Sequence, residues 1–326
     1  MYCKECGARL VPHAHFCHKC GATTGEEPEH NVPVPWEDDA AGNSSALRHQ
    51  RRGFVTFLLA LLCLLLCVVG EFVGVLVTLF AGGDEYLFGL LGCCVGAALG
   101  IYALGGARLL DPRYASLGYA LRTSWWLLAV STGITMLDAY GGFSGGLSIQ
   151  ADWLEKTWYA LALCASIGFS EEAMFRGLLM GGLLDAFGNN RRGVMTAVVL
   201  SSVLFGVAHI EWWSLNYADP LQLAQALLKI IQTGFFGFFL AALTLRSKSI
   251  LGPALVHGLA DFVIFFYSYC LLGEGLDVDY VSSGAEGVET MWLYLVMVVL
   301  YLPLVIKGVR MLRDVPVPEH GAFHKA

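Results

Sequence analysis

Residues 54–80 read FVTFLLALLCLLLCVVGEFVGVLVTLF, an apolar run in which Glu71 is the only charged residue. The hydrocarbon core of a bilayer is about 30 Å thick, so a helix of about 20 apolar residues is long enough to cross it. This run therefore predicts a transmembrane helix. Similar runs recur along the rest of the chain, separated by short charged loops.

The composition of the whole chain agrees with a membrane protein. Hydrophobic residues make up 56% of its 326 residues and charged residues only 14%, whereas about 25% of a soluble globular protein is charged. The mean hydropathy is +0.60. The net charge of −7 and the short basic clusters give no indication of nucleic-acid binding. The first twenty residues hold four cysteines and lack the apolar core of a cleavable signal peptide.

The recurring runs predict an all-α polytopic domain at 53–313 with about eight transmembrane helices, followed by a cytoplasmic tail at 314–326. The third run is short and contains polar residues. The eight expected spans are 54–80, 87–107, 124–140, 157–183, 193–210, 222–245, 249–272 and 290–312.

The positions of Lys and Arg test this count, because short cytoplasmic loops carry an excess of both. The alternate loops are acidic, and Lys156 is their only basic residue. Both termini are therefore predicted to be cytoplasmic, with the protein in the cell membrane. With eight spans, all basic clusters fall on one side of the membrane, at 48–52, 108–122, 191–192, 246–248 and 307–313.

The N-terminal segment 1–21 contains two copies of a Cys-x-x-Cys-Gly pattern. Four thiolates match the tetrahedral preference of zinc and leave no position for water, so the expected site is structural. The alternative is two disulfides, which a cytoplasmic location disfavours. The segment resembles the zinc ribbons at the start of many prokaryotic membrane proteins, which suggests a protein partner. The expected ligands are Cys3, Cys6, Cys17 and Cys20.

Residues 22–52 are expected to form a flexible linker between the ribbon and the membrane domain. The segment contains Pro28, Pro33 and Pro35, acidic residues and the run Gly42-Asn43-Ser44-Ser45. Such a composition provides too little apolar surface for a core.

Ionisable residues inside the expected fourth span indicate a functional site. The span contains Glu171-Glu172-Ala-Met-Phe-Arg176. A charged side chain at the centre of a bilayer costs about 2.5–3.5 kcal/mol, so it needs a partner or a role. Glu172 and Arg176 are four residues apart and can pair on one helix face. Glu171 points away from that face and has no such partner, so its carboxyl group is the candidate proton acceptor.

Two further spans carry histidines. The fifth ends in Phe205-Gly-Val-Ala-His209, and the seventh contains His257-Gly-Leu-Ala-Asp261. Asp261 lies one helical turn from His257 and can orient its imidazole. A single histidine in such a span is more often a packing residue, but two together with the acidic residues predict a site. Lys229 in the sixth span has no local acidic partner, and the sequence indicates no function for it.

Taken in order, the three segments resemble the motifs of the CAAX protease and bacteriocin-processing family, also called the Abi family. The family pattern is Glu-Glu-x-x-x-Arg, then Phe-x-x-x-His, then His-x-x-x-Asn or a similar residue. The resemblance covers approximately residues 150–275. It implies an intramembrane glutamic endopeptidase whose active site requires no metal. The implied substrate is a peptide or a membrane protein, and no nucleic acid is expected as a partner.

The resemblance also implies roles for the motif residues. Glu171 would activate a water molecule that His209 shares. Glu172 and Arg176 would hold the first carboxylate in place. A membrane cavity would strengthen these electrostatic contacts by excluding bulk water.

The third motif departs from the family pattern, because Asp261 stands where the family has Asn. The resemblance implies that His257 and the residue at position 261 stabilise the oxyanion. An ionised aspartate cannot donate a hydrogen bond. We therefore expect Asp261 to orient His257, which leaves the oxyanion to the imidazole.

Two other functions are compatible with the same sequence. Glu171, His209 and His257 could hold a catalytic zinc ion, although the sequence has no His-Glu-x-x-His motif. The membrane domain could also be a catalytically silent immunity or scaffold protein, with the ribbon as its interaction module.

Every peptidase mechanism further requires the three motifs to converge, although the topology places His209 nearer the outer face. Helix tilt or a broken helix would bring them together.

Overall fold

The computed structural model describes residues 17, 40–188, 190–273, 275, 280–317 and 323, and within the first helix it describes side chains from residue 52 on. The described residues form helices joined by short loops, and they contain no strand. The predicted all-α fold is confirmed.

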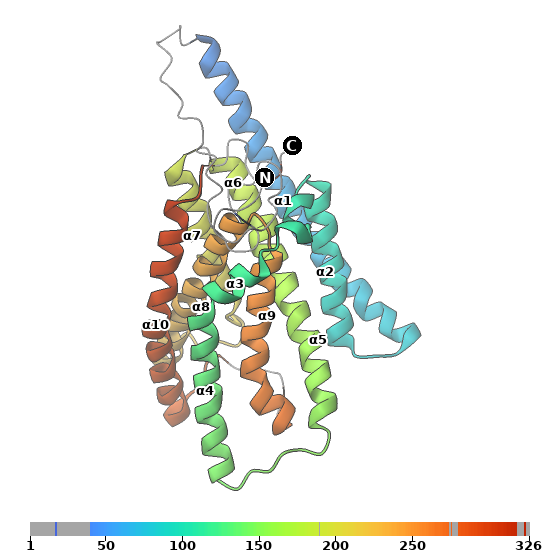
Figure 1. Cartoon of the computed structure of the whole chain (residues 1–326), viewed down its shortest axis with the longest axis vertical. Coiled ribbons are helices and arrows are strands. Elements are labelled where there is room, and N and C mark those ends of the chain that lie inside the picture. The colour runs from blue at the N-terminus through green and yellow to red at the C-terminus, as the bar shows by residue number, and fades with distance from the viewer. Residues whose placement is uncertain are drawn as a thin grey trace.

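The helices follow one another in the order in which Figure 1 labels them. Of the four short elements, η1 and η2 are 3₁₀ turns, whereas η3 and η4 are π-helices. The elements are α1 (Ala40–Ala81), α2 (Glu85–Ala103), η1 (Ala107–Leu110), η2 (Pro112–Tyr114), α3 (Leu117–Thr123), α4 (Trp125–Ser144), α5 (Trp153–Glu172), η3 (Ala173–Leu179), α6 (Met180–Phe187), α7 (Arg191–Ala208), α8 (Pro220–Ser247), α9 (Leu251–Phe265), η4 (Phe266–Leu271) and α10 (Gly284–Arg313).

Each of the eight expected spans coincides with a helix or with consecutive helices. Six of them, within α1, α2, α7, α8, α9–η4 and α10, are long and apolar enough to cross a membrane among the described residues. The other two, α4 and α5, are 20 residues each but less apolar. Polar residues such as Asp138 in α4 and the Glu171–Glu172 pair in α5 lower their hydropathy. The chain is a multi-pass membrane protein.

The first helix begins earlier than the sequence predicts. It starts at Ala40, inside the segment 22–52 that was expected to be a linker, and it runs without a break to Ala81. Ala46 and Leu47 are strong helix formers. Once the apolar part of the helix has formed, each further residue adds a hydrogen bond at little cost. The linker prediction is therefore corrected for residues 40–52.

Close contact through glycines holds α1 and α2 together at one side of the bundle. A Cβ atom at Gly70 would overlap the carbonyl of Gly92, and one at Gly96 would overlap the carbonyl of Leu66. Small residues of this kind allow helix backbones to approach closely in membranes. The hairpin of α1 and α2 lies at the edge of the molecule (Figure 1), and only 17% of the apolar window of α1 is buried, against 56% for α8.

Glycine contacts also join the helices that carry the three motifs. A Cβ atom at Gly168 of α5 would lie 2.5 Å from the carbonyl oxygen of Ala254, and one at Gly258 of α9 would lie 2.6 Å from that of Cys164. Gly206 of α7 packs in the same way against the carbonyl of Ile230 in α8. These contacts bring the backbones of α5, α7, α8 and α9 together at the level of the motifs.

Candidate active site

A change of helix type occurs directly after the paired glutamates. Glu171 and Glu172 are the last residues of α5, and Arg176 lies inside the π-helix η3. A π-turn closes its hydrogen bonds one residue later than an α-turn and is frequent at functional sites. Arg176 Nη1 lies 2.8 Å from Glu172 Oε1, and the two residues are 2% and 0% exposed. The predicted pairing of Glu172 with Arg176 is confirmed.

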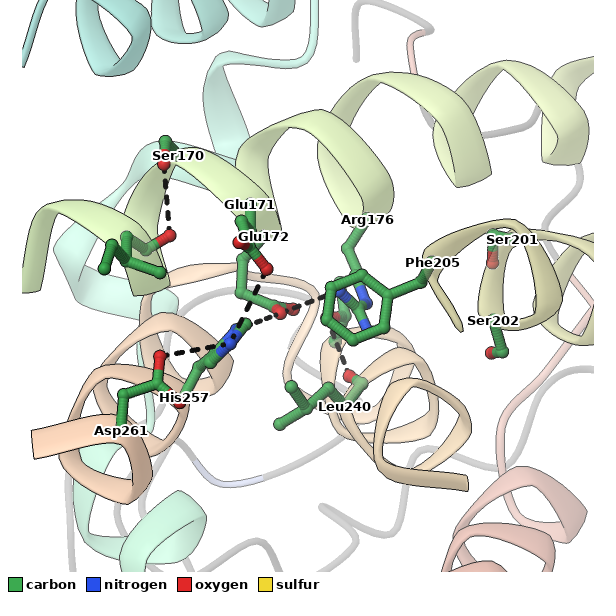
Figure 2. A network of polar contacts seen from close by, with 12 residues as sticks. Ser170, Glu171, Glu172, Arg176, Ser201, Ser202, Phe205, Leu240, His257 and Asp261 are labelled. Carbon is green, nitrogen blue, oxygen red and sulfur yellow. Dashed lines mark hydrogen bonds and ion pairs between the residues drawn. The ribbon is translucent and has the colours of Figure 1, made fainter. Parts of the chain in front are cut away.

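The same glutamate oxygen also contacts the seventh-span histidine. Glu172 Oε1 lies 3.0 Å from His257 Nδ1, so a single oxygen joins Arg176 to His257 (Figure 2). An ionised carboxylate only accepts hydrogen bonds, so Nδ1 is the donor. This orientation leaves His257 Nε2 directed at the other acidic residues. The sequence predicted a support role for Glu172 but not this contact, because 85 positions separate the two residues.

Phe205, which begins the second motif, makes contacts with the cluster that the sequence did not predict. Its ring covers the Arg176 guanidinium, whose Cζ lies 4.1 Å from the ring centroid. The ring also meets His209 and His257 edge-on, at centroid distances of 4.6 and 5.8 Å. A Cβ at Gly237 of α8 would lie 3.0 Å from Arg176 Nη2 and from the ring of Phe205. Two features of the sequence could have indicated these contacts: the phenylalanine that begins the second motif and the glycine inside α8.

Glu171 and the two histidines converge. Glu171 Oε2 lies 3.9 Å from His209 Nε2 and 3.7 Å from His257 Nε2. This oxygen is buried and has no hydrogen-bond partner among the described residues. The Glu171 side chain is 26% exposed and that of His209 19%, against 3% for His257. Glu171 and His209 are therefore partly exposed, whereas His257 is buried.

The position of His209 follows from the end of its helix. α7 ends at Ala208, and His209 is the capping residue that follows. Its Nδ1 lies 2.7 Å from the carbonyl oxygen of Phe205, one turn earlier. A carbonyl can only accept, so Nδ1 donates and Nε2 is free to accept a proton on the side of Glu171.

Asp261 lies beside His257, as its spacing predicts. Its Oδ2 is 3.5 Å from His257 Nε2, and its side chain is 23% exposed. His257 Nε2 thus faces the carboxylates of both Glu171 and Asp261 (Figure 2). This separation is longer than that of a usual direct hydrogen bond.

Lys229 lies near this cluster. The residue is half-buried on α8, and its Nζ is 4.0 Å from the ring centroid of Tyr280 and 5.6 Å from that of Tyr294. Tyr280 belongs to the segment before α10, and its ring lies 6.2 Å from that of His209. Burial raises the pKa of Tyr280, so its hydroxyl stays protonated. The sequence singled out Lys229 but could not place it against aromatic rings.

The structure does not test the predicted zinc ribbon, because three of its four expected ligands lie outside the described residues. These are Cys3, Cys6 and Cys20. Cys17 is described and is buried, with 1% of its surface exposed. Within the described part of the chain, no group of three or more His, Cys, Asp or Glu side chains has an arrangement that could hold a metal ion.

The segment that carries all three motifs also has a recognisable family signature. Residues 153–263 match the family model of the type II CAAX prenyl endopeptidase Rce1-like proteins. The match begins at the first residue of α5 and ends two residues after Asp261, so it includes every residue of the cluster. No curated protein and no solved structure matches the chain. The Rce1-like segment supports a CAAX-type membrane protease.

Proposed function

We propose that this protein is an intramembrane endopeptidase in which Glu171 activates the water that attacks a peptide bond. The observation that carries the proposal is the 3.9 Å separation of Glu171 Oε2 and His209 Nε2. This separation is too long for a direct hydrogen bond, whereas one water oxygen about 2.8 Å from each atom can bond to both. The unsatisfied carboxylate oxygen provides the acceptor that such a water needs.

In the proposed reaction, Glu171 Oε2 and His209 Nε2 both accept hydrogen bonds from the attacking water. Glu171 takes a proton from the water as its oxygen attacks the carbonyl carbon of the substrate, while His209 Nε2 holds and directs that water. Glu171 then returns the proton to the leaving amine as the carbon–nitrogen bond breaks. Protein groups in a water-poor site act strongly on such a reaction because little solvent screens them.

His257 is the proposed oxyanion partner. Its Nδ1 is bound to Glu172, so a protonated Nε2 would donate to the negatively charged oxygen of the tetrahedral intermediate. Asp261 holds the imidazole from the side of Nε2. Glu172, Arg176 and Phe205 act as positioning residues, because they contact the histidines and each other, away from the water site.

The name of the matched family points to prenylated peptides with a CAAX ending as the substrate class. We propose peptides or membrane proteins cleaved near the membrane surface, with prenylated CAAX peptides as the first class to test. Peptides of the bacteriocin type are the second. We further propose the cell membrane as the location and a cytoplasmic position for both termini, on the basis of the basic loops. Reporter fusions at each terminus and at the loop after α4 test this orientation.

Cleavage assays with the full chain in liposomes test the activity. The variants Glu171→Gln and His209→Ala should each lose at least about 100-fold in kcat/KM, the usual size of a general-base effect. Glu155→Gln is the matched control, because Glu155 is an exposed glutamate in the first turn of the same helix. Wild-type rates in both site variants, for every peptide that the protein cleaves, would show that Glu171 and His209 do not carry the reaction, and absence of cleavage of any peptide would count against the peptidase proposal itself.

A chelator distinguishes this mechanism from a zinc-dependent one that uses the same Glu171, His209 and His257. We expect cleavage to survive strong chelation. Metal analysis of the purified protein serves as a second readout, because four thiolates at Cys3, Cys6, Cys17 and Cys20 suit a structural zinc ion. Bound zinc should fall to background in the Cys3→Ser variant, while the cleavage rate should not depend on it.

A further inference from the structure

Two basic residues outside the proposed active site lie on neighbouring segments at the end of the bundle where α2 and α8 finish. Arg108 belongs to the turn η1 that follows α2, and Lys248 directly follows α8. The carbonyl oxygen of Leu109 accepts hydrogen bonds from Ser249 Oγ at 3.1 Å and from the backbone nitrogen of Ile250 at 3.0 Å. Each cation directly precedes a residue of this contact, so the contact holds the segments of the two cations together.

Acidic residues at this end of the bundle are bound by other arginines. Arg113 Nε donates to the two carboxylate oxygens of Asp111 at 3.0 and 2.9 Å, and Arg246 pairs with Asp314 at 3.3 Å. Within the part of the chain that the structure describes, no ion pair joins either of the two cations to a carboxylate. Burial lowers the pKa of Lys248, and the neighbouring guanidinium lowers it further. The two cations therefore provide positive charge that a bound anion would balance.

The backbone of Lys248 is unusual for a lysine. It lies in the left-handed region, with φ 57° and ψ 30°, where glycine is the usual residue after a helix because a side chain is strained there. The backbone nitrogen of Lys248 closes α8 by donating to the carbonyl oxygen of Thr244 at 2.7 Å, which a glycine would do equally well. The side chain adds strain that the helix end does not require, and such strain is frequent where a residue binds a ligand.

The two cations lie at the depth of lipid headgroups. Both follow helices that are long and apolar enough to cross a membrane. Tyr102 near the end of α2 and Trp125 at the start of α4 are 69% and 58% exposed, and such aromatic residues concentrate at the membrane–water interface. The ring of Tyr114 also supports Arg108, whose Cζ lies 4.4 Å from the ring centroid. Basic pockets at the ends of membrane helices bind anionic headgroups.

We propose that Arg108 and Lys248 bind the phosphate group of an anionic lipid. A guanidinium group and an ammonium group both bind phosphate oxygens through charge-assisted hydrogen bonds. Headgroup depth favours a lipid over a phosphate in solution. Ile250 is the capping residue of α9, so a lipid bound here would tie the end of α2 to the start of the helix that carries His257. The proposal is independent of the peptidase function, because its test requires no cleavage.

Native mass spectrometry of the full chain, released from a neutral detergent, measures the affinity for single lipids. Phosphatidylglycerol is compared with phosphatidylcholine that has the same acyl chains. A basic side chain near the surface contributes about fivefold to the affinity for an anionic lipid. The wild type should therefore prefer phosphatidylglycerol by roughly 25-fold. Arg108→Gln and Lys248→Gln should each weaken phosphatidylglycerol binding by about fivefold and leave phosphatidylcholine binding unchanged.

Two further variants separate a lost binding site from a damaged fold. Lys248→Gly should bind phosphatidylglycerol as weakly as Lys248→Gln does, yet it should unfold at a higher temperature than the wild type, because glycine fits the left-handed backbone. Arg310→Gln is the matched control. It removes the same charge from an exposed arginine in the last turn of α10, and it should keep the wild-type preference.

Three outcomes would overturn the proposal. The first is equal affinity of the wild type for the two lipids. The second is an undiminished preference in the double variant Arg108→Gln/Lys248→Gln, or an equal loss in Arg310→Gln, since the basic face would then act as a whole. The third comes from adding inorganic phosphate as a competitor. If it displaces phosphatidylglycerol at equal concentration, the two cations hold a soluble phosphate, contrary to the lipid assignment.

Discussion

Gly168 is predicted to tolerate no side chain, because it lies where α5 touches α9. A Cβ at this position would be 2.5 Å from the carbonyl oxygen of Ala254 and 2.6 Å from the amide nitrogen of Gly258. Ordinary contact begins at 3.4 Å, so Gly168→Ala must separate the two backbones by about 0.9 Å. Neither neighbour can move aside, since both are backbone atoms.

This displacement acts on the proposed site one turn later. Glu171 of α5 and His257 of α9 are separated by 3.7 Å between Oε2 and Nε2. A misplacement of about 1 Å in a reacting geometry can lower a rate by about 100-fold, and overpacking costs about 1–3 kcal/mol of stability. We expect Gly168→Ala to lose cleavage by about that factor and to unfold at a lower temperature.

Cleavage in liposomes and thermal unfolding in detergent measure the two effects. Gly133→Ala on α4 is the control, because a Cβ there has no atom within 4 Å, and alanine is the better helix former. That variant should equal or exceed the wild type in stability. A Gly168→Ala protein with wild-type kcat/KM and an unchanged melting temperature would refute the packing argument.

Three further substitutions test the buried cluster. Arg176→Met should lower the free energy of unfolding by about 3–5 kcal/mol, because it leaves Glu172 as a buried charge without its cation. The double variant Glu172→Gln/Arg176→Met should recover part of that stability in thermal unfolding. No recovery would contradict a coupled pair. Phe205→Leu removes a cation–π contact worth about 0.5–2 kcal/mol and two ring contacts to histidines, so both stability and cleavage should fall; an unaltered pair of values would argue against a positioning role. Asp261→Asn should keep substantial cleavage, because an amide can still orient His257; complete loss would show that the carboxylate itself is required.

Much of the fold could be predicted from the sequence. Apolar runs of about 20 residues identify membrane helices because the bilayer imposes their length, and all eight expected spans coincide with helices. The start of α1 could not be placed, because residues 40–52 have the polar composition of a linker and yet continue an existing helix. Local composition cannot show that a neighbouring segment has already nucleated the helix.

The candidate site shows the same division between local and distant contacts. The pairing of Glu172 with Arg176 is a contact at i and i+4, so spacing alone predicts it. The contact of Glu172 with His257 joins residues 85 positions apart and depends on how α5 packs against α9. The stacking of Phe205 on Arg176 depends likewise on the position of α7. A peptidase mechanism requires His209 to converge on Glu171, but the spacing of residues along the chain cannot show that the two meet.

The π-helix η3 has a consequence for comparing this protein with others. A turn whose hydrogen bonds span five residues holds one residue more than an α-turn of the same height. Residues 173–179 therefore act as a single-residue insertion between the paired glutamates and the helix that follows. A related protein whose helix lacks this π-turn would align with α5 up to Glu172 and with α6 after Leu179. Its sequence would show a gap of one residue between these two parts. Deleting one residue here should therefore convert the π-turn to an α-turn and leave α6 in the same rotational register relative to α5.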